Sequence, residues 1–489
     1  MNILASTYDK SGLDKFIRQF TERGARVYAT GGTWSFLSEN GIDAIELSEI
    51  TGFSTRADGR VKTLHPDVFS AILSRGGDDF LFDMVVVNLY PFQKYADADL
   101  KDMVENIDIG GVALIRAAAK NFQRVTVVCD PADYERVARE YKEGGEIPYS
   151  TRAEMAVKAF SITASYDILI RESLDRALGT GNRDFLLVSS RLRQALRYGE
   201  NPHQRGYLYH DGSGRGIPGA EQLQGKELSY NNIMDADAAL SAVAEFQEPA
   251  AVIVKHGTPC GAATAGNLKD AFLRALDADR ESAYGSIVAL NREVDVDAAR
   301  AMSELFMEVL VAPSYTEEAL RLLSRKKNLR VLRCSVERES GVRVRSVMHG
   351  FLVQDAMDVE PQRLERVAGP EADQGTVSDL LFAWRVVAHC RSNAVVLAKD
   401  GATVAIGQGQ TSRVEAVRIA LSKAGERARG AVMASDAFFP FQDSIEIAAQ
   451  HGVSAIIEPG GSIRDREVME AAEKGGISLY FTGKRVFLH

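Results

Sequence analysis

A lysine and a histidine stand side by side where a buried strand is predicted to end. The apolar segment 250–254, AAVIV, runs directly into Lys255 and His256. Histidine titrates near neutral pH and can accept a proton from a nucleophile, and a lysine ammonium can stabilise an oxyanion that forms beside it. Most isolated Lys-His pairs are only surface residues, but the apolar strand that leads into this one favours an acid–base pair.

A glycine turn near the amino terminus has the features of an anion site. Segment 25–30, ARVYAT, reads as a strand that runs into Gly31, Gly32 and Thr33, and a helix is predicted to follow. Backbone N–H groups at the start of a helix attract phosphate, and the ammonium of Lys10 would add a positive charge. Taken alone, such a turn is more often only structural, with Thr33 as a helix cap.

Three further loops of the first region carry polar side chains. Lys62 lies in VKTLHP, Asn88 and Tyr90 lie in NLYP, and Asp108 lies in IDIGG. Loops beyond the carboxyl ends of parallel strands are where open α/β sheets build their sites. The spacing supports a structural interpretation equally well, with Asp108 as a helix cap and Tyr90 as a core residue whose hydroxyl reaches water.

The elements that must position these residues divide the chain into an α/β region and two further α/β halves. Residues 2–47 alternate between strand and helix patterns, and MVVVNLY and RVTVVCD predict two more strands of a parallel sheet. We place the main boundary between residues 187 and 188. Residues 188–366 and 367–489 each combine short Val/Ile-rich strands with helices, which is compatible with a diverged internal duplication.

The composition argues against several classes of protein. The 489 residues contain 58 Lys and Arg against 67 Asp and Glu, and this net charge of −9 gives no general attraction to nucleic acid or anionic membranes. The first residues, MNILASTYDKSG, do not resemble a secretion signal, and the run MVVVNLY is too short to cross a bilayer. We therefore expect a folded cytoplasmic protein that binds neither nucleic acid nor a membrane.

The cysteines argue against a zinc site. The 4 cysteines are scattered and form no CxxC pair, which indicates reduced thiols. His256, Pro259 and Cys260 match part of the zinc deaminase signature, but the glutamate of H-x-E and the second cysteine of P-C-x-x-C are missing. A zinc hydrolase is disfavoured, whereas a related scaffold without metal remains compatible with the sequence.

A series of short motifs, in order along almost the whole chain, resembles the bifunctional AICAR transformylase/IMP cyclohydrolase family. The matching strings are GRVKTLHP, NLYPF, IDIGG, AAAKN, RYGENPHQ, VKHGTPCG, KKNLR, SNAVV, GQTSR, SDAFFPF and PGGSIRD. The resemblance implies an α/β fold with an amino-terminal methylglyoxal synthase-like parallel-sheet domain, residues 1–187, followed by two deaminase-like α/β halves without zinc.

The resemblance also implies activities and partners. The chain would transfer a formyl group from 10-formyltetrahydrofolate to AICAR, and would then close the ring of formyl-AICAR to give IMP. It implies no required metal. It further implies a homodimer whose transformylase site lies between the two subunits.

The cyclohydrolase site that the resemblance implies lies in the first region. Lys62 and Tyr90 would polarise the formyl oxygen, while Asp108 and Lys120 would move protons. A continuous helix after Asp108 would place Lys120 about 18 Å away from it. The substrate-binding residues would be Asp9, Lys10, Thr30, Gly31, Gly32, Thr33, Arg60, Thr63, Asn88 and Ile109.

The transformylase site that the resemblance implies lies in the second region. His256 would take a proton from the attacking amine, and Lys255 would stabilise negative charge on the formyl oxygen. The residues that hold AICAR would be Arg197, Tyr198, Gly285, Glu308, Asn393 and Arg413, and those on the folate side would be Val414, Phe438, Asp443, Gly460, Gly461 and Arg485.

The sequence departs from the family pattern at three places and leaves two other functions open. Tyr8 stands where a small hydroxyl residue is common, Ala388 stands where a lysine is frequent, and the carboxyl-terminal RVFLH replaces a more basic ending. The alternatives are a monofunctional phosphate lyase of the methylglyoxal synthase type with an appended domain, and a protein that senses a purine intermediate. An intact acid–base pair argues against the second, because binding alone does not need it.

Overall fold

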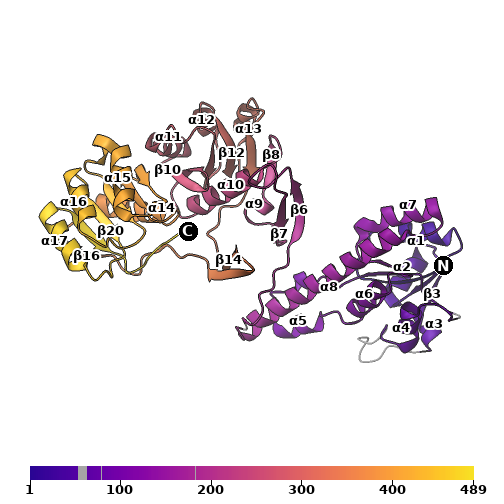
Figure 1. The fold of residues 1–489 in the computed structure, drawn as a ribbon. Helices are drawn as coiled ribbons and strands as arrows, with labels where there is room; N and C mark the ends of the chain where they lie inside the picture. The colour runs from indigo at the N-terminus through magenta and orange to yellow at the C-terminus, as the bar shows by residue number, and fades with distance from the viewer. Residues whose placement is uncertain (53–62, 79, 182) are drawn as a thin grey trace. The chain divides into compact units, whose positions relative to one another are not determined.

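The computed structural model describes residues 1–489 except 53–62, 79 and 182. The chain divides into two compact units, Met1–Ser190 and Arg191–His489 (Figure 1). The boundary predicted after residue 187 falls in the segment that joins α8 (Tyr149–Leu178) to β6 (Arg191–Leu196).

The first unit contains a parallel sheet of 5 strands in its described residues, with the order β3-β2-β1-β4-β5. The parallel sheet expected for this region is confirmed. Its strands are β1 (Asn2–Thr7), β2 (Arg26–Ala29), β3 (Ala44–Glu46), β4 (Met84–Asn88) and β5 (Thr126–Val128). The strand order reverses between β1 and β4, and the crevice outside the carboxyl ends of such a pair is where open α/β sheets bind ligands.

Helices cover both faces of this sheet. Ile3 and Ala5 pack into one core cluster with α1 and α7, whereas Leu4 packs into another with α4, α6 and α8, because successive side chains of a strand point to opposite faces. The helices are α1 (Leu13–Thr21), α2 (Gly31–Glu39), α3 (Leu47–Thr51), α4 (Pro66–Leu73), α5 (Leu100–Glu105), α6 (Gly110–Lys120), α7 (Tyr134–Gly144) and α8, with short 3₁₀ turns η2 (Phe92–Lys94) and η3 (Pro131–Asp133).

The second unit is built on one long mixed sheet. Among the described residues it has 12 strands in the order β16-β21-β20-β19-β17-β18-β10-β9-β11-β12-β13-β8. The strands of the first half are β8 (Glu221–Gln224), β9 (Ala250–Lys255), β10 (Thr258–Thr264), β11 (Ser286–Leu290), β12 (Met307–Ala312) and β13 (Arg330–Arg333). Those of the second half are β16 (Glu365–Ala368), β17 (Val395–Lys399), β18 (Ala402–Gly407), β19 (Val432–Ser435), β20 (Ala455–Glu458) and β21 (Ser478–Phe481).

The two halves of this sheet repeat one arrangement. Counted outward from the centre, the strand order is β10-β9-β11-β12-β13-β8 in the first half and β18-β17-β19-β20-β21-β16 in the second. The two central strands, β10 and β18, pair in antiparallel orientation at Ala263 and Ala402. This symmetry supports the internal duplication at which the sequence only hints. The predicted limit between the halves, 366/367, falls inside β16, which pairs with β21 of the second half.

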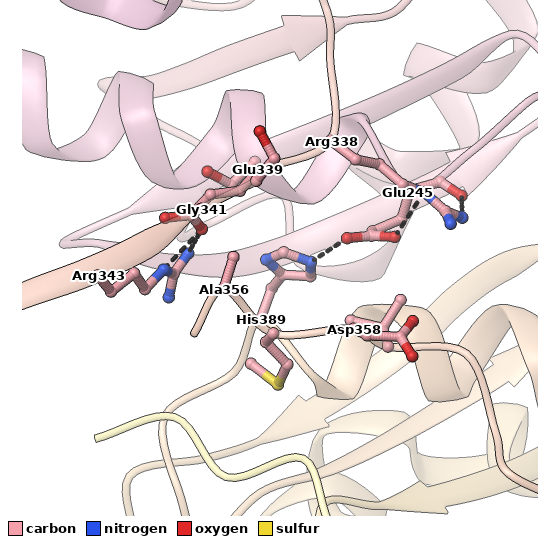
Figure 2. Close-up of a pocket in the computed structure, with 12 residues that line it drawn as sticks. Glu245, Arg338, Glu339, Gly341, Arg343, Ala356, Asp358 and His389 are labelled. Carbon is pink, nitrogen blue, oxygen red and sulfur yellow. Dashed lines mark hydrogen bonds and ion pairs between the residues drawn. The ribbon is translucent and has the colours of Figure 1, made fainter. Parts of the chain in front are cut away.

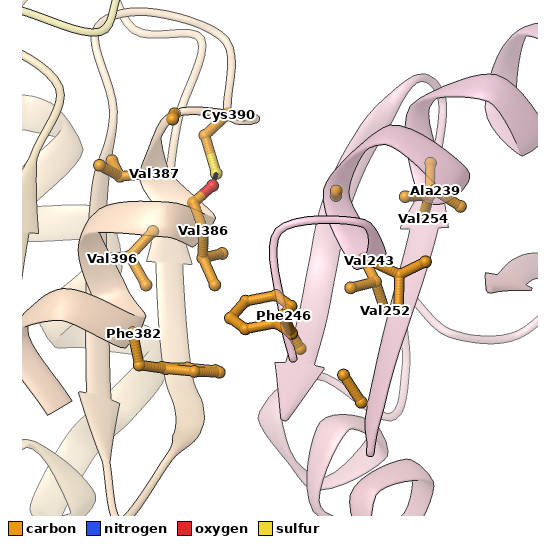
Figure 3. Packing of buried hydrophobic residues seen from close by; sticks show 14 of the residues in the cluster. Ala239, Val243, Phe246, Val252, Val254, Phe382, Val386, Val387, Cys390 and Val396 are labelled. Carbon is orange, nitrogen blue, oxygen red and sulfur yellow. Dashed lines mark hydrogen bonds between the residues drawn. The ribbon is translucent and has the colours of Figure 1, made fainter. Parts of the chain in front are cut away.

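One face of the long sheet has a core that both halves share. Helices α10 (Tyr230–Val243) and α14 (Gln374–Val387) lie in one cluster, where Phe246 and Phe382 meet with ring centroids 5.3 Å apart (Figure 3). The helices over the opposite face form separate clusters in each half. They are α11 (Leu268–Ala278), α12 (Val296–Met302), α13 (Glu317–Leu323), α15 (Arg413–Ala424), α16 (Asp443–Gln450) and α17 (Asp465–Gly475).

The remaining elements of the second unit are short. Two hairpins stand apart from the long sheet, β6 with β7 (Gly206–His210) and β14 (Val342–Val347) with β15 (Gly350–Asp355). A helical turn, α9 (Gly216–Gly219), precedes β8, and a 3₁₀ turn, η4 (Gly425–Ala428), follows α15. Across both units, no helix in the described part of the chain is long and apolar enough to span a membrane.

Candidate active sites

In the first unit, Asn88 ties together the two loops at the reversal point of the sheet. Its Oδ1 accepts hydrogen bonds from the backbone N–H groups of Tyr8 at 2.7 Å and Asp9 at 2.9 Å, and its Nδ2 donates to the Asp9 carbonyl at 2.8 Å. Lys10 donates from Nζ to the Tyr8 carbonyl at 3.3 Å. These residues line a cavity of about 770 Å³, which Lys94 also lines. The cavity therefore lies where the topology predicts a ligand.

Tyr8 contacts the predicted catalytic residue Tyr90. Their rings meet edge to face, with centroids 5.4 Å apart and planes at 87°. Burial raises the pKa of the Tyr90 phenol, and the negative charges of Asp108 and of Tyr8 when ionised raise it further. The departure from the family pattern at Tyr8 thus places a second aromatic ring against Tyr90.

The glycine turn begins α2 as predicted, but Thr33 does not cap that helix. Thr30 is the N-cap residue, and Thr33 lies inside the first turn. The hydroxyl of Thr33, which is 3% exposed, accepts from the Thr7 N–H at 3.0 Å and donates to the Thr7 carbonyl at 3.1 Å. Thr33 therefore fastens α2 to β1, and an anion at this turn would bind chiefly the N–H groups at the helix start.

Asp108 combines the structural and the functional interpretations. Its carboxylate accepts from the Gly111 N–H at 2.7 Å and from the Tyr90 N–H at 3.4 Å, while its own N–H donates to the Tyr166 hydroxyl at 2.8 Å. Burial raises the pKa of the Asp108 carboxyl, although the two N–H donors oppose that shift. Ile109, and not Asp108, is the N-cap residue of α6, although the Asp108 carboxylate binds an N–H of the first helical turn. A carboxyl with a raised pKa beside Tyr90 is suited to proton transfer.

The glycines of IDIGG make room for two polar side chains. A Cβ atom on Gly110 would lie 2.8 Å from Thr63 Oγ1, and a Cβ atom on Gly111 would lie 2.6 Å from Asp108 Oδ2. The structure shows that the two glycines let Thr63, which is buried, and Asp108 approach the first turn of α6.

Lys120 is the last residue of α6, and the length of this helix separates it from Asp108. Both residues, together with Ile109, line a second cavity of about 590 Å³ along α6 and α8, in which Arg116 and Phe160 also lie. Helix α6 is continuous over Gly110–Lys120, which agrees with the separation expected from the helical rise. Arg60 and Lys62, also predicted for this site, lie outside the described residues.

In the second unit, Lys255 ends β9 and its ammonium is fixed by two carbonyl groups. Nζ donates to the carbonyl oxygens of Tyr284 and Gly285, both at 2.9 Å. Gly285 has φ 69°, and a Cβ atom on it would lie 3.0 Å from Lys255 Nζ. Glycine at this position therefore supplies both the backbone conformation and the space that Lys255 occupies.

His256 follows in a left-handed backbone conformation. Its φ is 54°, which is uncommon for any residue other than glycine, and Gly257 continues the turn with φ 70°. The carboxylate of Asp235 on α10 accepts from the Gly257 N–H at 2.6 Å and from the His256 N–H at 3.3 Å. Sequence reasoning missed Asp235, because nothing in the spacing relates it to residues 21 positions further along.

Glu308, near the start of β12, is held from two sides. Its Oε2 accepts from Asn232 Nδ2 at 2.8 Å and lies 3.8 Å from a guanidinium nitrogen of Arg330. The loop that carries Arg197 and Tyr198 follows β6, and the Arg197 guanidinium lies 5.7 Å from the centroid of the Tyr198 ring.

Arg413 is buried and engaged with side chains of the second half. Its guanidinium donates to Asn393 Oδ1 and to Ser435 Oγ, both at 2.8 Å, and forms an ion pair with Asp436. The Asn393 amide in turn donates to the Gln410 carbonyl at 2.8 Å. Arg413 thus holds Asn393 in place, and Val414 follows it on α15.

Apart from Val414, the residues predicted for the folate side follow β19, β20 and β21. Glu458, fully buried, accepts from the Phe439 N–H at 2.6 Å and so joins the loop of Phe438 to the turn of Gly460 and Gly461. Asp443 begins α16, and the Arg485 guanidinium lies 4.4 Å from the centroid of the Phe487 ring. Phe438 remains 38% exposed, so its ring is available to a ligand.

Strand directions bring these groups to one edge of the sheet. Lys255 ends β9, Gly285 precedes β11, Asn393 precedes β17 and Glu458 ends β20, and the register places all four ends on the same side. Near the centre of this edge, Gln408 donates from Nε2 to the Pro259 carbonyl at 2.9 Å. The topology therefore brings the predicted AICAR and folate residues from separate halves to one edge of the sheet.

A third cavity, of about 260 Å³, has no counterpart in the sequence motifs. Glu245 lies between Arg338 Nε, at 3.2 Å from its Oε2, and His389 Nε2, at 3.4 Å from its Oε1 (Figure 2). The three residues come from separate segments, so no local pattern could have found this cluster. Among the residues that the structure describes, no group of His, Cys, Asp and Glu could hold a metal ion.

Two family models match the chain, and together they define one class of bifunctional enzyme. The family model described as AICARFT/IMPCHase bienzyme matches residues 118–423, and the model of the MGS-like domain matches residues 12–113. The chain belongs to the AICARFT/IMPCHase bienzyme family. It is a bifunctional enzyme of purine biosynthesis, with the activities of an AICAR formyltransferase and an IMP cyclohydrolase.

Full-length relatives agree with this assignment. The "Bifunctional purine biosynthesis protein PurH" of Halalkalibacterium halodurans is 47% identical over 99% of both chains, and the protein of the same name from Bacillus subtilis is 46% identical over 99% of both. A solved structure described as "Crystal structure of ForH" is 30% identical over 37% of this chain and 100% of its own, with a TM-score of 0.34. The resemblance stated from the motifs is confirmed, and the lyase and sensor alternatives are set aside.

Proposed function

We propose that the two activities use two separate sites, formyl transfer in the second unit and ring closure in the first. The single observation that supports this most strongly is the pairing of Lys255 and His256 at the end of β9, because the ammonium is fixed on two carbonyls and the histidine backbone is held by Asp235. The candidate ring-closure residues Tyr90 and Asp108 lie in the other unit.

Formyl transfer moves one carbon between two nitrogen atoms. The family uses a formyltetrahydrofolate as cosubstrate, and the proposed donor is the 10-formyl isomer. The AICAR amine attacks the formyl carbon, His256 takes the proton from that amine, and Lys255 stabilises the negative charge on the formyl oxygen. The bond to N10 then breaks, N10 takes a proton, and tetrahydrofolate and formyl-AICAR leave. No step requires a metal ion.

Ring closure needs an attack within one molecule and the loss of water. The carboxamide nitrogen of formyl-AICAR attacks the formyl carbon. The formyl oxygen departs as water after it gains two protons, one from the carboxamide nitrogen and one from the formamido nitrogen. Tyr90 would polarise that oxygen, and Asp108, whose pKa is raised by burial, would carry a proton between the nitrogen and the oxygen. The phosphate would lie near Lys10 and the start of α2. Lys62 and Lys120 are proposed on the resemblance alone.

The proposed assembly is a homodimer in the cytoplasm. Hairpin β14–β15 exposes a series of apolar side chains, which a second copy of the chain would cover. They are Val342, Val344, Val347, Phe351, Leu352 and Val353. Sedimentation of the protein with Phe351→Asp tests this assignment, because the dimer should weaken. The cytoplasmic location is proposed because the four cysteines are free.

Two reciprocal variants test the separation of the sites. His256→Ala should abolish the formation of tetrahydrofolate from AICAR and 10-formyltetrahydrofolate, but it should still cyclise supplied formyl-AICAR. Asp108→Asn should do the reverse, and it keeps an acceptor for the Gly111 N–H. Loss of both activities in either variant would contradict separate sites. Formate in place of the folate donor should give no product, and product from formate would overturn the proposed donor.

A further inference from the structure

The turn that carries His256 has a structural copy in the other half of the sheet. In the first half, α10 provides Asp235 to the β9–β10 turn; in the second half, α14 provides Asp379 to the β17–β18 turn. Asp379 accepts from the N–H groups of Asp400 at 2.7 Å and Gly401 at 2.6 Å. These two bonds correspond to those that Asp235 forms with His256 and Gly257.

The backbone of the two turns is also the same. Asp400 has φ 55° and Gly401 has φ 71°, against 54° and 70° for His256 and Gly257. A left-handed conformation is unfavourable for residues other than glycine, and the carboxylate at each turn compensates by accepting both N–H groups. The carboxylate therefore stabilises the turn in both halves, whether or not the turn carries a catalytic group.

The lysine before each turn is repeated as well. Lys399 donates from Nζ to the Arg429 carbonyl at 3.4 Å, and a Cβ atom on Gly430 would lie 3.4 Å from the same nitrogen. Lys255 has the corresponding contacts with Tyr284 and Gly285. The two turns differ in the residue that occupies the left-handed position, which is histidine in one and aspartate in the other, and in the second carbonyl, that of Gly285, which Lys255 also binds.

Only in the first half does the carboxylate face cations that the proposed chemistry uses. Asp235 lies within electrostatic reach of both Lys255 and His256, and the guanidinium of Arg391 approaches the same turn, 3.6 Å from where a Cβ atom on Gly257 would lie. Burial raises the pKa of the Asp235 carboxyl. The N–H groups of Gly257 and His256 and the positive charges of the His256 and Lys255 side chains oppose the shift. A carboxylate beside an imidazole favours its protonated form.

We propose that Asp235 is a positioning residue for formyl transfer, which holds His256 in its left-handed conformation and stabilises the imidazolium that forms when His256 takes the proton of the AICAR amine. The inference rests on the proposed role of His256. It predicts that Asp235 affects the rate of transfer and the pH at which His256 becomes active, and that it affects the binding of AICAR little.

The copy in the second half provides the matched control. Asp235→Asn and Asp379→Asn each remove one charge and one acceptor oxygen from equivalent turns. In Asp235→Asn, we expect kcat for formyl transfer to fall at least about tenfold, with the Kd for AICAR changed less than about threefold. The acidic limb of its pH–rate profile should move to lower pH, because the imidazolium loses a neighbouring anion. Asp379→Asn should keep the wild-type kcat and profile.

Several outcomes would overturn the inference. Equal small effects of the two variants, or a loss of kcat in Asp235→Asn without movement of the acidic limb, would show that Asp235 acts only in folding. If Asp235→Asn does not bind AICAR, the same measurements of kcat, Kd and the pH–rate profile are made on Asp235→Glu. This variant keeps the charge and should therefore keep the position of the acidic limb. Full transfer activity in His256→Ala would instead refute the proposed function, which distinguishes the two failures.

Discussion

The guanidinium of Arg413 and the carboxylate of Asp436 form an ion pair that is buried on both sides, with 5% and 0% of the two side chains exposed. The pair lies at the edge of the long sheet that carries Asn393, which Arg413 also binds. Two buried charges gain little net stability from each other, because their desolvation offsets much of their attraction, but removal of one partner leaves the other without compensation.

We therefore expect Asp436→Ala to lower the free energy of unfolding by about 3–5 kcal/mol. Urea unfolding of the second unit measures this loss. The matched control is Glu415→Ala, which breaks the exposed pair of Glu415 with Arg418 on the same helix as Arg413 and should cost less than about 1 kcal/mol. Similar losses in both variants would show that burial of Arg413 does not matter.

Glu458 should make the stability depend on pH. Full burial raises the pKa of its carboxyl to about 8, with the negative charge of Asp465 adding to the shift and the Phe439 N–H and Arg413 opposing it. In the unfolded chain the same group titrates near about 4.3. Between these two pKa values the folded protein holds a proton on Glu458 that the unfolded chain has lost. The stability that this proton contributes is therefore lost as the pH rises toward 8.

Glu458→Gln removes that titration while it keeps an acceptor for the Phe439 N–H. We therefore expect the free energy of unfolding of the variant, relative to that of the wild type, to increase from pH 5 to pH 9. The increase should be on the order of a few kcal/mol. Urea unfolding of both proteins at the two pH values measures the difference. A difference that stays constant with pH would show that Glu458 does not titrate in this range.

Gly285→Ala should displace Lys255. Its φ of 69° strains any side chain, and the new Cβ atom would lie 3.0 Å from Lys255 Nζ. Because Lys255 would stabilise the formyl oxygen, we expect kcat for formyl transfer to fall by about 100-fold. Gly430→Ala in the other half has the same strain, with φ 73°, but lies near Lys399. Unfolding experiments should show comparable losses of stability in the two variants. An equal loss of kcat in both would contradict a specific role for Lys255.

The sequence predicts those parts of the site that depend on local pattern. The apolar run before Lys255 places it correctly at the end of a strand, and the glycine turn correctly begins α2. Thr33 was assigned wrongly as a cap, because its hydroxyl binds β1 rather than its own helix. A cap is a local contact, whereas the partner of Thr33 is brought close only when the sheet forms.

Contacts between distant segments are not visible in the sequence. Asp235 and Asp379 each reach a turn more than 20 residues away, and Arg413 meets Asp436 through the pairing of β17 with β19. The internal duplication was equally hard to see, since the sequence shows only that both halves combine short Val/Ile-rich strands with helices. Strand order and backbone conformation preserve it, because they depend on the hydrophobic pattern and on a few turn residues rather than on identity.

The most direct test of two separate sites on one chain is a mixing experiment. His256→Ala and Asp108→Asn are each incubated with AICAR and 10-formyltetrahydrofolate, alone and together, and IMP is measured. Neither variant alone should produce IMP, whereas the mixture should produce it after a lag, as formyl-AICAR passes from one variant to the other. A mixture that makes no more IMP than the separate variants would contradict the account.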